Sequence, residues 1–247
     1  MKYLITFAYD GTFYEGYQVQ GNKKTIQKTI EDCLYKMNSN EPVKISASGR
    51  TDKGVHANNQ KAHFTLKKEV DENKLKNSLN KLLPNDIYIK NVEKVSCDFH
   101  ARFDVEKKEY IYKINLGEYN PTQINYVFQY NRPLNIKEIK KATLYLIGEH
   151  NFKAFTKVDE EKESYIRTIY DIQTNCEKNI LTFTFIGNGF LRYMVRNIVG
   201  TLVNVGEGKI NANDIKDILK KQDRKKAGLK APACGLYLNN VYYSKHN

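Results

Sequence analysis

The chain has 247 residues, of which 40% are hydrophobic, enough for one large domain or two small ones around a real core. Its 40 Lys and Arg exceed its 28 Asp and Glu and give a formal net charge of +12. This excess favours a polyanionic partner: nucleic acid first, an anionic membrane second. No apolar run approaches about 20 residues, which argues against a membrane span.

The cellular compartment is indicated by two further features. The first residues enter a strand directly, without the features of a signal peptide. The cysteines are scattered along the chain, which indicates a reducing cytosol rather than a disulfide framework. They are Cys33, Cys97, Cys176 and Cys234.

The first part of the chain alternates between strand and helix patterns. The helical spacing of Ile26, Ile30 and Leu34 predicts a helix after Thr25, whose side chain suits an N-cap. A second helical segment ends before Pro84, which cannot continue it. We expect strands at residues 2–9, 43–47, 61–66 and 87–95, and helices at 25–37 and 71–83.

The rest of the chain shows the same mixture. Residues 168–174 and 179–185 are typical of a hairpin, and residues 190–205 carry an apolar stripe at helical spacing. We also expect strands at 109–115 and 235–243, and helices at 136–146 and 212–220. Because strands and helices mingle without strict βαβ alternation, the fold class is α+β around a mostly antiparallel sheet.

An internal similarity suggests a duplicated architecture. Residues 5–7 align with residues 181–183, and at the same offset Gly11 aligns with Gly187 and Tyr17 with Tyr193. Each copy is a strand, a glycine turn and a helix, which favours duplication over coincidence. We place the domain boundary near Val105, between an N-terminal half, 1–105, and a C-terminal half, 106–247. A cleft between two such halves would suit an elongated RNA.

The densest cluster of functional side chains is Ser48-Gly49-Arg50-Thr51-Asp52-Lys53-Gly54-Val55-His56-Ala57. Its two glycines let the backbone turn or approach a ligand closely. A carboxylate presented on such a connector can be a nucleophile or a general base, and the arginine can hold phosphate or neutralise the acid. The plain alternative is a charged turn, but the whole run is too specific for that interpretation.

This run resembles the active-site signature of the TruA-type tRNA pseudouridine synthases. Further segments resemble other signatures of that family, in the family's order and over nearly the whole chain. They are Ala8-Tyr9-Asp10-Gly11-Thr12 with Gly16-Tyr17-Gln18, Phe99-His100-Ala101-Arg102-Phe103, Tyr110-Ile111-Tyr112, residues 187–198 and Ala231-Pro232-Ala233-Cys234-Gly235-Leu236.

The resemblance implies a pseudouridine synthase fold, with two similar α/β halves that share a mostly antiparallel sheet and a central RNA-binding cleft. It implies an isomerase that converts uridine to pseudouridine in the anticodon arm of tRNA, at positions 38–40. It further implies a cytoplasmic homodimer that needs no cofactor.

The resemblance also implies the catalytic residues. Asp52 is the essential carboxylate, which attacks the sugar, attacks the base or abstracts a ribose proton; the sequence leaves all three open. Tyr110 is expected to pack on the target base and assist proton removal from C5, and Tyr112, two residues along the same strand, would face the same side and contact the substrate RNA. A buried carboxylate needs a cation to stay charged, and Arg196 is the expected partner of Asp52.

The remaining candidates are substrate contacts. We expect Arg50 and Arg102 to contact phosphate or to fill the space left by the flipped base. Lys53, where the family commonly has a small residue, would point to RNA. His56 is either an RNA contact or a structural histidine. Cys97 and His100 have the spacing of a metal pair, but a zinc site needs four ligands and no second pair accompanies them, so no metal is expected.

Two other classes of protein remain as alternatives. One is a catalytically silent RNA-binding protein, which would bind tRNA without isomerising any base. The other is a nucleosidase that uses Asp52 against the bond between sugar and base. It would be expected to carry a second catalytic carboxylate, for which Asp10 is the nearest candidate within a motif.

Overall fold

A computed structural model describes residues 1–157 and 164–244 of the chain. The chain forms two compact units: residues 1–106 together with the final segment from Tyr237 onward, and residues 107–236. The predicted boundary near Val105 lies beside this division. The final strand, however, groups with the first unit, whereas the sequence prediction placed it in the C-terminal half.

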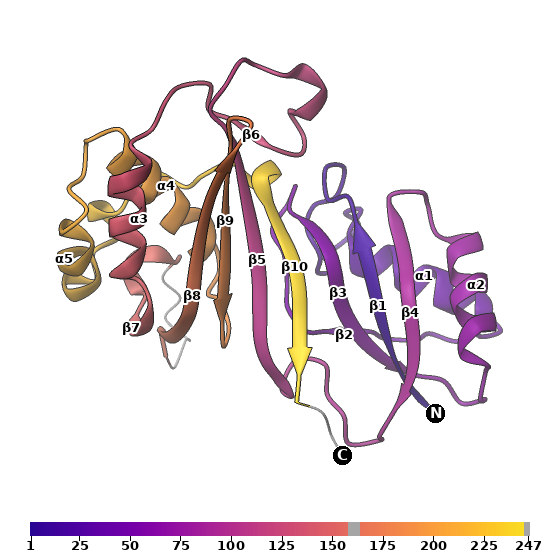
Figure 1. Cartoon of the computed structure of the whole chain (residues 1–247). Helices are drawn as coiled ribbons and strands as arrows, with labels where there is room; N and C mark the ends of the chain where they lie inside the picture. Colours follow the sequence, from indigo (N-terminus) through magenta and orange to yellow (C-terminus); the bar gives the residue numbers. More distant parts are fainter. Residues whose placement is uncertain (158–163, 245–247) are drawn as a thin grey trace. The chain divides into compact units, whose positions relative to one another are not determined.

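The first unit contains a sheet with the strand order β4-β1-β3-β10 (Figure 1). Strand β1 is antiparallel to both of its neighbours, whereas β10 runs parallel to β3, with Tyr237 opposite His56. Its strands are β1 (Lys2–Tyr9), β3 (His56–Thr65), β4 (Ile87–Val95) and β10 (Leu236–Tyr243), with the two-residue β2 (Ser46–Ala47) paired to β3. Strand β3 begins inside the glycine-bounded signature, earlier than expected.

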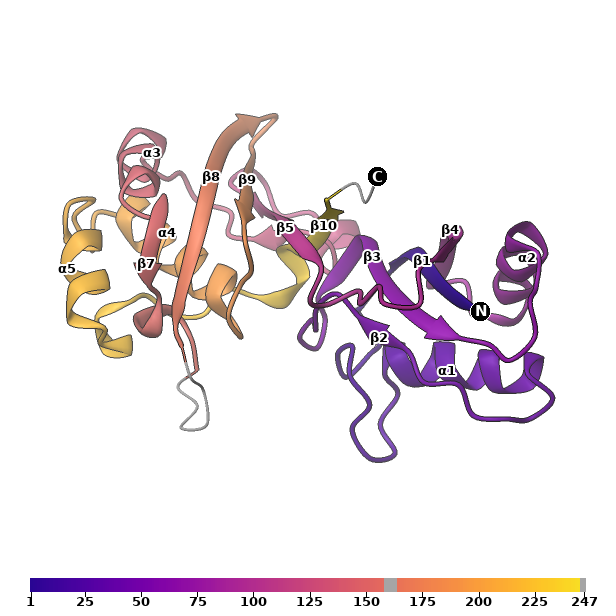
Figure 2. The same ribbon diagram turned by 90° about the horizontal axis from the view of Figure 1, so that it is seen from below.

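Two capped helices, α1 (Ile26–Met37) and α2 (Glu72–Leu82), complete this unit. The Thr25 side chain accepts a hydrogen bond from Lys28 N, and Asp71 accepts one from Lys74 N, so both helices begin where the sequence predicts. Figure 2 shows α1 lying across one face of these strands, and the apolar residues at helical spacing are buried.

The second unit is built on an antiparallel sheet with the order β5-β9-β8-β7. The predicted hairpin is confirmed: its turn residues Lys178 and Asn179 both have positive φ, 49° and 63°, as a two-residue turn of type I′ requires. The strands are β5 (Val105–Asn115), β6 (Phe128–Gln129), which is parallel to β5, β7 (Gly148–Asn151), β8 (Ile166–Glu177) and β9 (Ile180–Gly187).

Helix α4 (Met194–Gly206) is the buried helix of the second unit and packs against α3 (Ile136–Leu144). It begins four residues later than predicted because Tyr193 has a φ of +65°, which a right-handed helix cannot include. The other helical segments are α5 (Asp214–Lys221) and the short η1 (Pro121–Gln123), η2 (Lys153–Phe155), η3 (Arg224–Lys226) and η4 (Ala233–Gly235).

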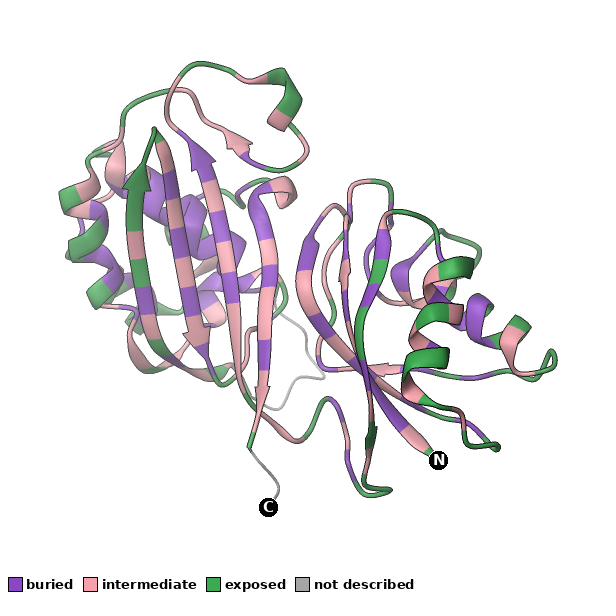
Figure 3. Cartoon of the chain, turned by 45° about the vertical axis from the view of Figure 1, so that its right-hand side comes forward, coloured by how far each residue is buried: buried purple, intermediate pink, exposed green. Residues whose placement is uncertain are grey.

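Burial alternates along the strands of both units, as expected where one sheet face is covered (Figure 3). The α+β class and the mostly antiparallel pairing are confirmed. Within residues 1–157 and 164–244, no helix is both long enough and apolar enough to cross a bilayer.

Candidate active site

The loop from Ser48 to Val55 carries Asp52 on a tight turn. Val55 N donates to the Asp52 carbonyl at 3.2 Å, and Gly54 has a φ of +74°. This is the conformation that favours glycine, so the predicted role of Gly54 is confirmed. The Asp52 side chain is half-buried.

Two glycines of the preceding motif press directly against this loop. A Cβ on Gly16 would lie 3.0 Å from Thr51 O, and one on Gly11 would lie 2.0 Å from Val55 O. Tyr17 N also donates to Thr51 O at 3.1 Å. The segment from Gly11 to Tyr17 therefore forms a backbone support for the Asp52 turn, and only residues without a side chain fit at the two contacts.

Buried polar side chains hold the loop at its start and in its middle. Ser48 Oγ lies 2.6 Å from Gln60 Oε1, and Gln60 Nε2 donates to Gly49 O at 3.0 Å. The Tyr9 hydroxyl lies 2.8 Å from Thr51 Oγ1, and burial raises the pKa of Tyr9 to about 12, so this hydroxyl stays protonated. Tyr9 and Gln60 were not singled out from the sequence as supports, since nothing local links them to the loop.

Lys53 has a partner within the first unit. Its Nζ lies 2.6 Å from Glu15 Oε1, and this hydrogen bond is the main reason that the pKa of Glu15 is lowered. Both side chains are exposed, so the pair is weak and can exchange for another anion. The predicted orientation toward RNA stays a prediction.

His56 belongs to the interior. Its side chain is 2% exposed, Gly11 N donates to Nδ1 at 3.2 Å, and the ring stacks on Tyr237 at 4.8 Å between centroids. Asp10 Oδ1 lies 3.1 Å from the same nitrogen. Of the two interpretations left open by the sequence, these contacts support the structural histidine over the RNA contact.

The segment from Phe99 to Asp104 forms a turn that presents two exposed side chains. His100 Nδ1 accepts from Arg102 N at 3.1 Å, and Asp104 Oδ2 accepts from His100 N at 2.8 Å. The His100 ring stacks on Phe103 at 4.2 Å, and Phe103 nevertheless remains 74% exposed beside the exposed Arg102. An apolar ring held this openly was not identified as a site residue from the sequence.

Arg50 and Arg102 are close enough to interact. The pKa of the Arg50 guanidinium is lowered first by partial burial and second by the positive charge of Arg102. Two positively charged side chains close together in one unit favour the binding of an anion.

In the second unit Arg196 lies within α4 and is only 8% exposed, so it is a buried residue and does not face solvent. Its Nε donates to Ala231 O at 2.8 Å, and its own carbonyl accepts from Ala231 N at 3.1 Å. The guanidinium carbon lies 5.9 Å from the Tyr193 ring centroid.

Tyr110 and Tyr112 both lie on β5 but have different surroundings. Tyr110 is 8% exposed and meets the Phe190 ring edge-to-face at 5.1 Å. Tyr112 is fully buried, its hydroxyl donates to Pro232 O at 2.7 Å, and burial raises its pKa well above the usual value. Tyr112 is therefore a core residue, and its predicted RNA contact is corrected.

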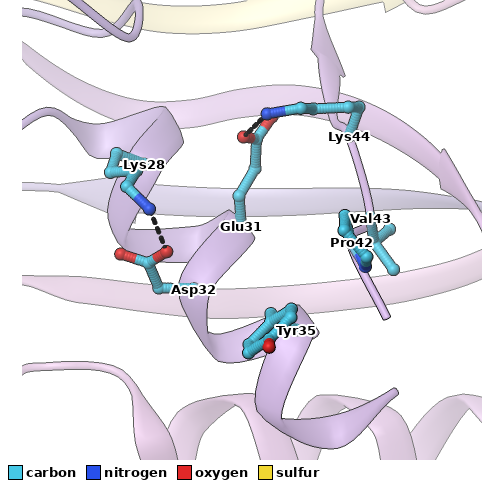
Figure 4. Close-up of a pocket in the computed structure, with 7 residues that line it drawn as sticks. All are labelled: Lys28, Glu31, Asp32, Tyr35, Pro42, Val43 and Lys44. Carbon is cyan, nitrogen blue, oxygen red and sulfur yellow. Dashed lines mark hydrogen bonds and ion pairs between the residues drawn. The ribbon is translucent and has the colours of Figure 1, made fainter. Parts of the chain in front are cut away.

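The pocket drawn in Figure 4 contains none of the predicted site residues. It has a volume of about 230 Å³ and lies between α1 and the segment before β2. Its buried Glu31 is held by Lys44 Nζ at 2.9 Å and by Ile45 N at 3.2 Å, so this carboxylate anchors the segment. Among residues 1–157 and 164–244, no group of three or more His, Cys, Asp or Glu side chains is placed to hold a metal ion.

The candidate site presents a carboxylate on a tight turn. The chain around it is strongly basic and exposes arginines and an aromatic ring. Together these features are typical of an enzyme site that acts on nucleic acid. The family model for tRNA pseudouridine synthase matches residues 5–104 and 142–244. The chain belongs to the tRNA pseudouridine synthase family, and within it to the TruA type.

Individual relatives support this assignment. The chain is 47% identical over 240 residues to tRNA pseudouridine synthase A 1 of Bacillus cereus, covering 97% of each protein. It is 39% identical over 251 residues to tRNA pseudouridine synthase A of Limosilactobacillus reuteri, covering 100% of this chain and 98% of the relative. A crystal structure of a Cbf5-Nop10-Gar1 complex aligns with a TM-score of 0.37 and 11% identity, over 95% of this chain and 57% of that one, and the fold assignment does not depend on it.

Proposed function

We propose that this protein converts uridine to pseudouridine in the anticodon arm of tRNA, at positions 38–40. As a member of its family the protein is an isomerase that acts on tRNA uridine. The observation that carries the proposal is the intact Asp52 loop in a chain that relatives named tRNA pseudouridine synthase A match over 97–100% of its length.

The reaction breaks the bond between uracil N1 and ribose C1′ and forms one between C5 and C1′. The proton on C5 leaves and N1 gains one, so atoms and electrons balance without an oxidant or an energy source. Asp52 acts as the carboxylate at this junction. Each of its three possible roles, attack on the sugar, attack on the base or removal of a ribose proton, requires the ionised form.

Arg196 and Tyr110 complete the proposed catalytic set. On the resemblance to the family, Arg196 is proposed as the cation that keeps the Asp52 carboxylate charged when substrate displaces water. The Tyr110 ring, fixed edge-to-face by Phe190, packs on the target base and assists removal of the C5 proton.

Arg50, Arg102 and Phe103 form the proposed RNA contact of the first unit. The arginines hold backbone phosphates, and the exposed Phe103 ring stacks on an unpaired base, as aromatic side chains do in proteins that read RNA loops. Extrusion of the target uridine leaves such unpaired neighbours.

The proposed setting is a homodimer in the cytoplasm. The four cysteines are free, which suits a reducing compartment. The dimer is proposed on the resemblance to the family, and sedimentation of the purified protein tests it.

The central test is Asp52→Asn, which removes the charge and leaves the side-chain volume nearly unchanged. With tRNA tritiated at uridine C5, we expect tritium release to disappear while tRNA binding persists. Undiminished turnover would refute the assignment of Asp52. Free uracil among the wild-type products would favour a nucleosidase, and binding without tritium release by the wild type would favour the silent RNA-binding protein.

A further inference from the structure

Residues 224–232, here called the strap, run along α4 within the second unit in backbone-to-backbone contact. A Cβ on Gly200 of α4 would lie 1.6 Å from Leu229 O, and a Cβ on Gly228 would lie 2.6 Å from Gly200 O. Neither position tolerates a side chain unless the strap moves away. The distance between strap and helix is therefore fixed by two glycines.

Polar side chains tie the strap to the same helix. Arg224 donates from Nη2 to Asn197 Oδ1 and from Nη1 to Gly228 O, both at 2.9 Å. Asn197 Nδ2 donates in turn to Phe155 O at 2.7 Å, and Gly228 N donates to Thr201 Oγ1 at 2.8 Å. Asn197 and Thr201 are 2% and 1% exposed, so these are interior hydrogen bonds that water does not readily replace.

Near its C-terminal end the strap contacts Arg196 of α4. Ala231 receives the Arg196 Nε–H at its carbonyl and donates its own N–H to the Arg196 carbonyl. The Nε–H bond lies in the plane of the guanidinium, so an acceptor placed on it fixes the direction of the two terminal nitrogens. The position of the Ala231 carbonyl consequently sets the orientation of the Arg196 fork.

We infer that Arg224 and Asn197 are positioning residues for Arg196, acting through the strap. Arg224 joins the strap carbonyls of Ala227 and Gly228 to the buried side chain of Asn197 on α4, and the strap carries this restraint along to Ala231. The inference rests on the role given to Arg196 under the proposed function. It assigns a task to an arginine that lies outside the family signatures in the sequence.

The test compares Arg224→Ala and Arg224→Lys with Arg132→Ala. Arg132 is an exposed arginine of the same unit whose guanidinium approaches Glu207 at 3.7 Å, and it serves as the control. We expect Arg224→Ala to lower kcat by about 10- to 100-fold with KM for tRNA changed less than about twofold, because misplacement of a catalytic group by about 1 Å costs up to about 10²-fold. Arg224→Lys restores part of the loss, and Arg132→Ala changes neither constant.

A double-mutant cycle separates positioning from a general structural defect. In an Arg196→Ala background, Arg224→Ala should have no further effect on kcat, since the group that it positions is already gone. Should Arg224→Ala fold poorly, Thr201→Val removes the acceptor of Gly228 N, together with the hydrogen bond that Thr201 donates to Asn197 O within α4, and should lower kcat in the same non-additive way.

Three results would overturn the inference, and they are distinguishable. A rise in KM at unchanged kcat would make Arg224 an RNA contact. If Arg224→Ala lowered kcat by the same factor in the Arg196→Ala background as in the wild type, Arg224 would act independently of Arg196. Full kcat in Arg196→Ala alone would remove the proposed role of Arg196, while loss of activity in Asp52→Asn would show that the proposed reaction still holds.

Discussion

Replacing Gly16 by alanine tests whether the segment from Gly11 to Tyr17 holds the Asp52 turn in its active geometry. Gly16 has a φ of +95°, where an L side chain costs roughly 1–2 kcal/mol. The new Cβ would also lie 3.0 Å from Thr51 O and 3.2 Å from Lys53 N, so the Asp52 turn must move by a few tenths of an ångström. Together these effects should cost about 2–3 kcal/mol of folding free energy.

Two measurements follow from this estimate. For a chain of this size 1 kcal/mol corresponds to about 2–4 °C, so Tm should fall by about 4–12 °C. A displacement of a few tenths of an ångström at the carboxylate should lower kcat roughly five- to tenfold, measured as tritium release under single-turnover conditions well below the Tm.

Gly21→Ala supplies the matched control. Gly21 also has a positive φ, +51°, but a Cβ there would have nothing within 4 Å. It should show the backbone cost, about 1–2 kcal/mol, without any change in kcat. Equal kcat in Gly16→Ala and Gly21→Ala would refute the view that the Gly16 contact maintains the catalytic geometry.

Three further predictions concern the first unit. Arg102→Ala should raise KM for tRNA several-fold and reduce the slope of log affinity against log salt by about 1, in filter-binding titrations; an unchanged slope would remove Arg102 from the phosphate contacts. Phe103→Ala should weaken tRNA binding by about 1–3 kcal/mol whereas Phe103→Trp retains it, and an equal loss in the exposed control Tyr88→Ala would contradict stacking by Phe103. Burial, and then the nearby His100, lowers the pKa of His63 to about 4, so the unfolded chain binds a proton that the folded chain does not between about pH 6.5 and 4. Folding stability should therefore decline as the pH falls through this range, and His63→Gln should flatten that part of a plot of Tm against pH, whereas an identical profile would assign the decline to other groups.

The parts of the fold that local patterns determine were predictable. The spacing of Ile26, Ile30 and Leu34 and the side chain of Thr25 define α1 without help from the rest of the chain, and the hairpin of β8 and β9 follows from two apolar runs around a short turn. The predicted start of α4 was wrong because Tyr193 has a left-handed backbone conformation, which the apolar stripe does not indicate.

The candidate site was predictable in part for the same reason. Gly54 marks the Asp52 turn locally through its positive φ, which Gly49 does not share, whereas the roles of Asp52, Tyr110 and Arg196 came from the resemblance to a family. The supports of the loop, Tyr9 and Gln60, and the strap that reaches Arg196 join residues that are far apart in sequence. Strand periodicity placed Tyr110 and Tyr112 on one side of β5, but it could not tell that Tyr112 is fully buried whereas Tyr110 keeps 8% of its surface exposed.

The return of β10 to the first unit has a consequence for biosynthesis. When the ribosome has made residues 1–106, β3 still lacks the neighbour that will pair with His56 and Ala57, close in sequence to the proposed catalytic Asp52. Its unpaired N–H and C=O groups form an open edge that can template association with another nascent chain. Only when the last residues leave the ribosome can β10 pair with β3 and cover that edge. The unit translated first is therefore completed only at the end of synthesis.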